Sequence, residues 1–235
     1  MTSAALDAVT AAKRAAAEYA VDRTVESGMR IGLGTGSTAV WAVRRVGSLL
    51  ASGALRDVVA VPTSEVTAAD AKTYGVPVTT LEVNPVLDVT VDGADEVDDA
   101  LDCIKGGGGA HLREKLVAQA TARLVIVVDS SKLVPVLGTA FPLPVEVIQM
   151  ARVPETLYLE ALGFAVSWRQ RDGAPFVTDE GNWILDVTTG PIEDKQGLQD
   201  RLLRRAGIVE VGLFLGMASD VIVATPGEDV RHLTR

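Results

Sequence analysis

The chain has 235 residues, a length that suits one large domain or two modest ones. Its 31 acidic residues outnumber its 22 basic ones, and the resulting net charge of −9 argues against nucleic acid or an acidic membrane surface as a partner. The composition is 48% hydrophobic but only 4% aromatic, so we expect an ordered core built mainly from Ala, Val, Leu and Ile.

Cysteine usage and the N-terminal segment bear on the cellular compartment. A single cysteine, Cys103, excludes an intrachain disulfide and a zinc site built from several cysteines. The first twenty residues carry charges such as Asp7, Lys13 and Glu18, where a signal peptide needs an unbroken apolar stretch. No apolar run approaches the roughly 18 residues of a membrane-spanning helix. We therefore expect a soluble, cytoplasmic protein with no membrane partner.

Apolar runs of strand length alternate with helix-like stretches along the chain. Several runs are continuous and rich in β-branched residues, as in strands buried on both faces of a parallel sheet. The predicted strands of this kind are Met29–Leu33, Asp57–Val61, Leu87–Val91, Leu124–Val128 and Val221–Ala224. The predicted helices between them are Leu6–Ser27, Thr38–Leu50, Thr67–Tyr74 and Leu112–Arg123. This alternation predicts an α/β fold with a Rossmann-like, mostly parallel sheet flanked by helices.

The pattern changes after Phe141, where a strand, a helix, two strands, a helix and a strand follow one another. That is the split βαβ order of a ferredoxin-like α+β unit. Its predicted elements are Val145–Ile148, Pro154–Leu162, Phe164–Arg169, Trp183–Val187, Lys195–Arg204 and Val209–Leu215. We predict a smaller domain at residues 142–218, inserted into an α/β domain formed by residues 1–141 and 219–235. The chain then returns to the first domain with Asp220–Ala224 and a last helix.

Four predicted strands end in small, hydroxylated or ionisable residues. The segments concerned are Gly34–Thr38, Pro62–Ser64, Asp92–Glu96 and Asp129–Lys132. Because ligands of open parallel sheets bind beyond the carboxyl ends of the strands, the four segments predict one rim of a site. Ordinary turns and helix caps use the same residue types and remain the alternative for any single segment.

The glycine-rich turn Gly32–Thr38 joins a predicted strand to a predicted helix. It departs from the dinucleotide pattern GxGxxG, because Ser37 and Ala39 stand where glycine is required, and it lacks the lysine of a P-loop. Backbone N–H groups at a helix N-terminus suit a single phosphate, and the hydroxyls of Thr35, Ser37 and Thr38 would add to them.

A run of four glycines, Gly106–Gly109, follows Lys105. Such a run is a poor helix interior and a poor strand, so it favours a backbone that approaches a ligand closely. Lys105 lies near two aspartates in the sequence, which favours a role in charge stabilisation. An ordinary surface lysine is the alternative.

Three carboxylates in this region are candidates for chemistry. Asp92 and Asp95 lie three residues apart, with Gly93 between them, in a turn that leaves a buried strand. Glu114 falls within about the first turn and a half of the next predicted helix. The helix dipole alone favours a carboxylate there by a few tenths to about 1 kcal/mol, which is a purely structural explanation for Glu114.

The other acidic residues of the segment have simpler explanations. We predict a solvated acidic surface at Asp98, Asp99 and Asp102. A magnesium site formed by Asp92, Asp95 and Glu96 remains an alternative. The two histidines, His111 and His232, form no ligand cluster in the sequence, so we expect no metal and no cofactor.

Taken in order, these motifs resemble those of the A-type ribose-5-phosphate isomerases. The matching stretches are GLGTGST, DGADE, KGGGG followed by REK, DSSK and PLPVEV, and the spacing between Lys105 and Glu114 also matches. The resemblance covers nearly the whole chain, including the inserted domain. It implies interconversion of D-ribose 5-phosphate and D-ribulose 5-phosphate in the pentose phosphate pathway, without a cofactor, by a homodimer or homotetramer.

The resemblance also implies roles for individual residues. The implied catalytic residues are Glu114, Asp92, Asp95 and Lys105, with Glu114 moving a proton between C1 and C2. The implied substrate-binding residues are Thr35, Gly36, Ser37, Thr38, Asp92, Gly93, Ala94, Asp95, Lys105, Gly106, Gly107, Gly108 and Lys132. Lys13 corresponds to a lysine that faces the phosphate, without a sharp motif around it. His111 and Glu65 stand where the family has an apolar or small residue and a neutral residue.

A non-catalytic domain of the same fold that senses sugar phosphates is the alternative. Such a domain needs the glycine-rich turn and the acidic turn, but it has no use for Glu114 at this distance from Lys105. It would also be expected to carry a DNA-binding segment, which the single alanine-rich helix at the N-terminus does not predict. An acyl-CoA transferase or an amino-sugar phosphate deaminase sharing the fold is a further alternative. The deaminase would need a catalytic histidine near the acidic turn, and none lies there.

Overall fold

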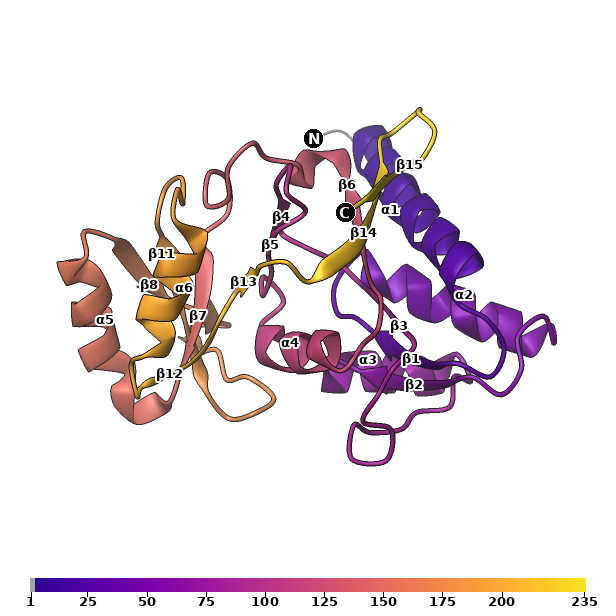
Figure 1. Cartoon of the computed structure of the whole chain (residues 1–235), viewed down its shortest axis with the longest axis horizontal. Coiled ribbons are helices and arrows are strands. Elements are labelled where there is room, and N and C mark those ends of the chain that lie inside the picture. The colour runs from indigo at the N-terminus through magenta and orange to yellow at the C-terminus, as the bar shows by residue number, and fades with distance from the viewer. Residues whose placement is uncertain (1–2) are drawn as a thin grey trace. The chain divides into compact units, whose positions relative to one another are not determined.

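The computed structural model describes residues 3–235, with side chains from residue 7 onward, and it divides into two units (Figure 1). Unit 1 contains the residues up to Ala94, Arg113–Lys132 and Met217–Arg235, and unit 2 contains Asp95–Leu112 and Leu133–Gly216. Each unit has its own hydrophobic core. The predicted insertion at residues 142–218 overlaps unit 2 over most of its length, and its limits stay a prediction.

Unit 1 is built on a six-stranded sheet in the order β15-β14-β6-β3-β1-β2. Its strands are β1 (Arg30–Leu33), β2 (Val59–Pro62), β3 (Val89–Asp92), β6 (Leu124–Asp129), β14 (Ala218–Ala224) and β15 (Arg231–Thr234). All neighbours from β14 to β2 pair in parallel. Every residue of β3 and β6 is buried, which agrees with the continuous apolar runs and confirms the predicted parallel sheet.

Helices cover both faces of this sheet. They are α1 (Ser3–Thr24), α2 (Ala39–Ala51), α3 (Glu65–Thr73) and α4 (His111–Gln119). Helix α1 packs against α2, β6 and β14, and alanines such as Ala16 and Ala20 are fully buried in this interface, where small side chains let the backbones approach. On the opposite face, Val117 of α4 packs with Val61 and Leu87. The carboxyl ends of the parallel strands therefore meet the loops that begin α2, α3 and η1 (Ser130–Lys132).

The expectation of a last helix is wrong. Residues Arg231–Thr234 form the strand β15, which pairs antiparallel with β14 and closes that edge of the sheet. The turn after β14 contains Pro226 and Gly227, residues that favour reversal of the chain over helix. A helix there would leave the backbone groups of β14 without partners on one side.

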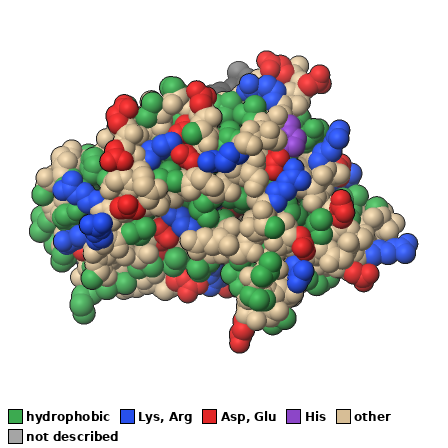
Figure 2. All heavy atoms as spheres, viewed as in Figure 1, with side chains coloured by type: hydrophobic (Ala, Val, Ile, Leu, Met, Phe, Trp, Pro, Cys, Tyr) green, Lys and Arg blue, Asp and Glu red, His purple; other side chains and the backbone are tan. Residues whose placement is uncertain are grey.

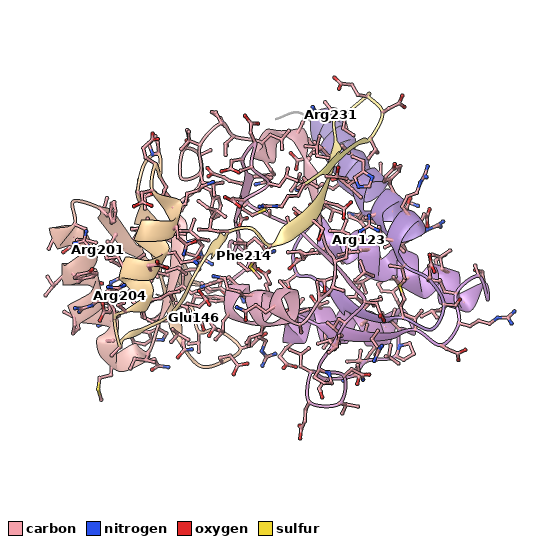
Figure 3. All side chains as sticks on the ribbon, viewed as in Figure 1. Arg123, Glu146, Arg201, Arg204, Phe214 and Arg231 are labelled. Carbon is pink, nitrogen blue, oxygen red and sulfur yellow. The ribbon has the colours of Figure 1, made fainter. Side chains whose placement is uncertain are left out.

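Asp220 on β14 ties the terminal strand to the rest of unit 1. Arg123, which is labelled in Figure 3, donates to both of its carboxylate oxygens, at 2.7 and 2.9 Å. His232 Nε2 of β15 lies 2.7 Å from Oδ1. Hydrogen bonds from Arg123 lower the pKa of Asp220 below its ordinary value. The buried carboxylate thus joins β14 to the residue before β6 and to β15.

Unit 2 contains a four-stranded antiparallel sheet in the order β12-β7-β11-β8. Its elements are β7 (Leu143–Val147), η2 (Gln149–Ala151), α5 (Arg152–Ala161), β8 (Ala165–Trp168), the hairpin β9 (Gln170–Arg171) and β10 (Ala174–Pro175), β11 (Trp183–Thr188), α6 (Lys195–Leu203) and β12 (Ile208–Val211). The element order and the sheet order confirm the predicted ferredoxin-like unit.

The prediction of a single strand at Val209–Leu215 is wrong, because the segment forms two strands separated by Gly212. Strand β12 ends at Val211, and β13 (Leu213–Phe214) pairs instead with β5 (Cys103–Ile104), which pairs with β4 (Glu96–Val97). Gly212 donates to Pro144 O at 2.8 Å and accepts from Lys105 N at 2.9 Å. A Cβ at this position would overlap the Lys105 carbonyl oxygen, so the crossing of two sheets requires glycine.

The described surface mixes charges of both signs. Figure 2 shows Lys and Arg side chains interspersed with Asp and Glu side chains over the viewed face, rather than gathered into one basic surface. Among the helices that the structure describes, none is both long enough and apolar enough to cross a membrane.

We predict that Asp220→Asn lowers the unfolding free energy at pH 7 by about 1.5–3 kcal/mol, because it weakens hydrogen bonds to a charged group. The lowered pKa of Asp220 means that its stabilising contribution is complete above the unfolded pKa and disappears as the pH falls through the folded value. Urea unfolding of both proteins should therefore converge at low pH. The exposed Asp229→Asn, in the same terminal hairpin, is the control and should change stability little. An equal deficit at all pH values would contradict the assignment.

Candidate functional site

The turn Gly34–Thr38 is held in place by a cluster of hydroxyl groups in unit 1. Thr35 Oγ1 lies 2.7 Å from the Thr63 hydroxyl, 2.8 Å from that of Ser64 and 3.0 Å from that of Thr67. Thr67 also donates to Gly34 O at 3.0 Å. Ser64 caps α3 by accepting from Thr67 N. The start of α3 therefore fixes the conformation of the turn after β1.

Asp92, at the end of β3, fixes the same turn from the neighbouring strand. Its Oδ1 accepts hydrogen bonds from Thr35 N at 3.1 Å and from Gly93 N at 2.7 Å, and the residue is 1% exposed. A Cβ on Gly34 would overlap the Asp92 carboxylate. The glycine before Thr35 is thus required by the close approach of a buried carboxylate.

The N-terminus of α2 offers backbone donors. Gly36 has φ +116°, with open space where a Cβ would stand, and Thr38 at the N-cap makes no side-chain capping bond. Within the part of the chain that the structure describes, the N–H groups of Ser37 and Thr38 have no main-chain acceptor. Lys13 of α1 donates to Ser37 Oγ at 3.0 Å and lies 4.0 Å from Asp129 Oδ2. A helix N-terminus next to an ammonium group suits an anionic ligand.

Two further predicted residues belong to unit 1. Glu114 lies in the first turn of α4 and is only 3% exposed. Lys132 lies in the short helix η1 after β6 and is partly exposed. The predicted placement of Glu114 near the start of a helix is confirmed.

Unit 2 contains the rest of the acidic turn and the glycine run. Asp95 Oδ2 accepts from Gly107 N at 2.7 Å. Lys105 is 2% exposed, and its Nζ lies 5.3 Å from the ring centroid of Phe214, which Figure 3 shows on β13. Gly106 and Gly109 have positive φ values of +111° and +84°. The description of Lys105 as an ordinary surface lysine is therefore wrong.

The predicted sites thus form two groups. Residues Thr35, Gly36, Ser37, Thr38, Asp92, Gly93, Ala94, Glu114 and Lys132 belong to unit 1, and Asp95, Lys105, Gly106, Gly107 and Gly108 belong to unit 2. Within unit 1, hydrogen bonds join Asp92 to the Thr35 turn. Within unit 2, a hydrogen bond joins Asp95 to the glycine run. The chain itself passes from one group to the other at Ala94–Asp95.

Glu96, Asp98 and Asp102 have structural partners, whereas Asp99 is exposed as predicted. Glu96 accepts from Gly138 N, Ala140 N and Phe141 N at 2.5–2.7 Å, so both its oxygens are occupied by backbone donors rather than available to a metal. The predicted solvated surface is wrong for Asp98 and Asp102, which are buried and each lie 2.6 Å from Lys195 Nζ. Only folding brings this lysine, more than 90 residues away, to the two aspartates.

Sequence reasoning missed two residues that support the site, Thr67 and Arg169. Thr67 belongs to no motif. Its position at a predicted helix start, shortly after the predicted site residues Thr63 and Ser64, was the one available signal. Arg169 donates to the carbonyl oxygens of Gly106 and Gly107. Its position between two strands of another sheet carries no local signal of that contact.

His111 is fully buried in unit 2. Its Nε2 lies 3.8 Å from Oε2 of Glu146, and Gly106 packs against its ring. Burial raises the pKa of Glu146, while hydrogen bonds from Asn182 and Thr178 act in the opposite direction. His111 is therefore a core residue whose ring packs against the glycine run at Gly106.

Comparison with known proteins agrees with this architecture. A family model described as ribose 5-phosphate isomerase A (phosphoriboisomerase A) matches residues 59–228. The chain is 51% identical to the ribose-5-phosphate isomerase A of Chloroflexus aurantiacus, over 96% of this chain and 94% of the relative, and 50% identical to that of Desulfatibacillum aliphaticivorans, over 91% and 93%.

Solved structures are similar over nearly the whole fold. The ribose 5-phosphate isomerase from Plasmodium falciparum is 38% identical with a TM-score of 0.93, covering 96% of this chain and 99% of that one. A D-ribose-5-phosphate isomerase solved in complex with phospho-erythronic acid is 36% identical with a TM-score of 0.93, covering 97% and 99%. The similarity therefore includes both units.

We predict that Thr67→Val lowers the unfolding free energy by about 1–3 kcal/mol. The substitution keeps the shape of the side chain but leaves the Gly34 carbonyl without its donor in a buried position. Urea denaturation measures the change. Thr67→Ser keeps the hydroxyl and serves as the matched control, with most of the stability retained. Equal stability of Thr67→Val and the unsubstituted chain would show that the cluster does not hold the turn.

Proposed function

The chain belongs to the ribose 5-phosphate isomerase A family, and from that premise we propose how its residues interconvert D-ribose 5-phosphate and D-ribulose 5-phosphate. It is an enzyme, so the alternative of a non-catalytic sensing domain is set aside. The observation that carries the proposal is the burial of three ionisable side chains, with Asp92, Lys105 and Glu114 all 1–3% exposed. Burying charge is costly, and such groups concentrate at functional sites.

The phosphate is assigned to the turn Thr35–Thr38. The support for this assignment is the set of N–H donors at the start of α2 and the ammonium group of Lys13 beside Ser37. Lys132 is proposed as a further contact to the substrate. The relative that binds phospho-erythronic acid supports a phosphorylated sugar acid or sugar as the kind of ligand.

Glu114 is assigned as the base that moves the proton. It removes the proton from C2 of the open-chain aldose, the C–H electron pair forms the C1–C2 double bond, and negative charge moves onto O1. After a proton passes from O2 to O1, the protonated Glu114 returns its proton to C1, and the ketose forms at C2. The aldose and the ketose are at the same oxidation level, so the reaction needs no redox cofactor. Acid–base catalysis of this kind contributes roughly 10²–10⁴-fold.

Lys105 and the amides of the glycine run are assigned to the charge on the enediolate. A preorganised positive group at a developing oxyanion is worth about 10²–10³-fold. Asp92 and Asp95 are assigned to proton transfer among the sugar hydroxyls and to opening of the ring form. Their support is the way each carboxylate is held by backbone amides, Asp92 by Thr35 and Gly93 and Asp95 by Gly107.

We predict that Glu114→Gln lowers kcat by at least about 10²-fold, because the amide cannot accept the proton. Turnover of ribose 5-phosphate in deuterated water, followed by proton NMR, measures both isomerisation and exchange of the C2 hydrogen, and both should be lost. The exposed Glu160→Gln in α5 makes the same chemical change and should leave kcat unaltered. Near-normal turnover in Glu114→Gln would remove Glu114 from the mechanism.

Lys105→Ala is predicted to lower kcat by about 10²-fold while KM for ribose 5-phosphate changes much less, since the lysine acts on charge that develops after binding. Steady-state kinetics separates the two effects. Lys132→Ala, at a proposed binding residue, should act mainly on KM, and the exposed Lys72→Ala should change neither. A rise in KM alone for Lys105→Ala would assign this lysine to substrate binding instead.

A further inference from the structure

Arg169 connects the small sheet of unit 2 to the glycine run. It stands between β8 and β9, and its Nε donates to Asp186 Oδ2 at 3.0 Å while Nη2 donates to Asp186 Oδ1. Its remaining nitrogen, Nη1, donates to Gly106 O at 2.5 Å and lies 3.2 Å from Gly107 O. The two side chains are mostly buried, with exposed fractions of 13% and 18%. Asp186 thus neutralises the guanidinium and sets its direction.

The Gly106–Gly107 peptide group is hydrogen-bonded at both its carbonyl oxygen and its N–H. The carbonyl of Gly106 and the N–H of Gly107 belong to the same peptide plane. Arg169 donates to its oxygen, and its N–H donates to Asp95 Oδ2 at 2.7 Å. A positive group and a negative group therefore hold the plane from opposite ends, and bonds in such a chain polarise one another.

The peptide needs this support because both of the residues that it joins are glycines. It has glycine on both sides, and Gly106 has φ +111°, so the backbone has little conformational preference of its own. Glycine is nevertheless required, since a Cβ on Gly107 would stand 2.5 Å from Asp95 Oδ1. The close contact with Asp95 therefore requires glycine, and glycine leaves the turn without a side chain to restrict its conformation.

We propose that Arg169, anchored by Asp186, is a positioning residue that fixes the Gly106–Gly107 peptide and, through it, the carboxylate of Asp95. The inference rests on the proposed function for the catalytic role of Asp95. Strand pairing does not require the Arg169 side chain, because the backbone makes these bonds. The N–H of Arg169 donates to Ile184 O at 3.0 Å, and its carbonyl accepts from Phe176 N at 2.9 Å. The side chain is therefore available for a task other than holding the sheet.

The test compares Arg169→Met with Arg169→Lys, and uses the exposed Arg204→Met in unit 2 as the control. Hydrogen exchange at the Gly107 amide, followed by NMR, should be at least about tenfold faster in Arg169→Met. The same variant should lose about 10- to 100-fold in kcat with a smaller change in KM, since a displaced catalytic group costs up to about 10²-fold. Arg169→Lys restores one donor to the carbonyl and should recover part of both. Arg204→Met should match the unsubstituted protein.

Asp186→Asn serves as a second variant that keeps the Arg169 side chain but weakens its anchor, and a smaller acceleration of Gly107 exchange is expected. Unchanged Gly107 exchange in both Arg169→Met and Asp186→Asn would overturn the inference. Asp95→Asn, assayed in parallel, separates the two proposals. Normal kcat in Asp95→Asn would refute the catalytic assignment of Asp95, whereas the exchange data would still report on Arg169.

Discussion

A carboxylate removed from water must find hydrogen-bond donors, and in this chain the backbone supplies them. Asp92 and Glu96 are buried and Asp95 is half-buried, and each of these three neighbouring carboxylates accepts hydrogen bonds from main-chain N–H groups. The donors are Thr35 and Gly93 for Asp92, Gly107 for Asp95, and Gly138, Ala140 and Phe141 for Glu96. The short acidic segment after β3 therefore organises several loops, and the candidate catalytic groups take their orientation from these bonds.

The same constraint explains the glycines of the motifs. At two positions a carboxylate lies so close to the backbone that only glycine fits, because a Cβ at Gly34 or Gly107 would overlap Asp92 or Asp95. The resulting loops have few conformational restrictions of their own, so other groups hold them. Hydroxyls around Thr35 do this in unit 1, and the guanidinium of Arg169 does it in unit 2. Side chains from other elements therefore fix the conformation of these loops.

Local pattern predicted much of the fold. Continuous apolar runs identified the strands of the parallel sheet, because burial on both faces leaves a strong signal in a few residues. The ferredoxin-like order was readable for the same reason. The errors arose where a distant partner decided the outcome. The segment at Arg231–Thr234 became a strand because β14 had an open edge, and Gly212 broke a strand because Lys105 and Pro144 pack against it.

The motifs alone were enough to identify the family, and with it the chemical types and spacing of Asp92, Lys105 and Glu114. Spacing along the chain does not specify which groups hold those residues. Arg169 lies about 60 residues from the glycines it contacts, and Lys195 lies more than 90 residues from its aspartates. Hydrogen-bond partners at such separations are determined when the elements pack. An unpaired polar group costs free energy once it is buried, and it is buried only in the folded chain. Tertiary structure therefore decided how the reactive groups are held, and the motif sequence decided which groups they are.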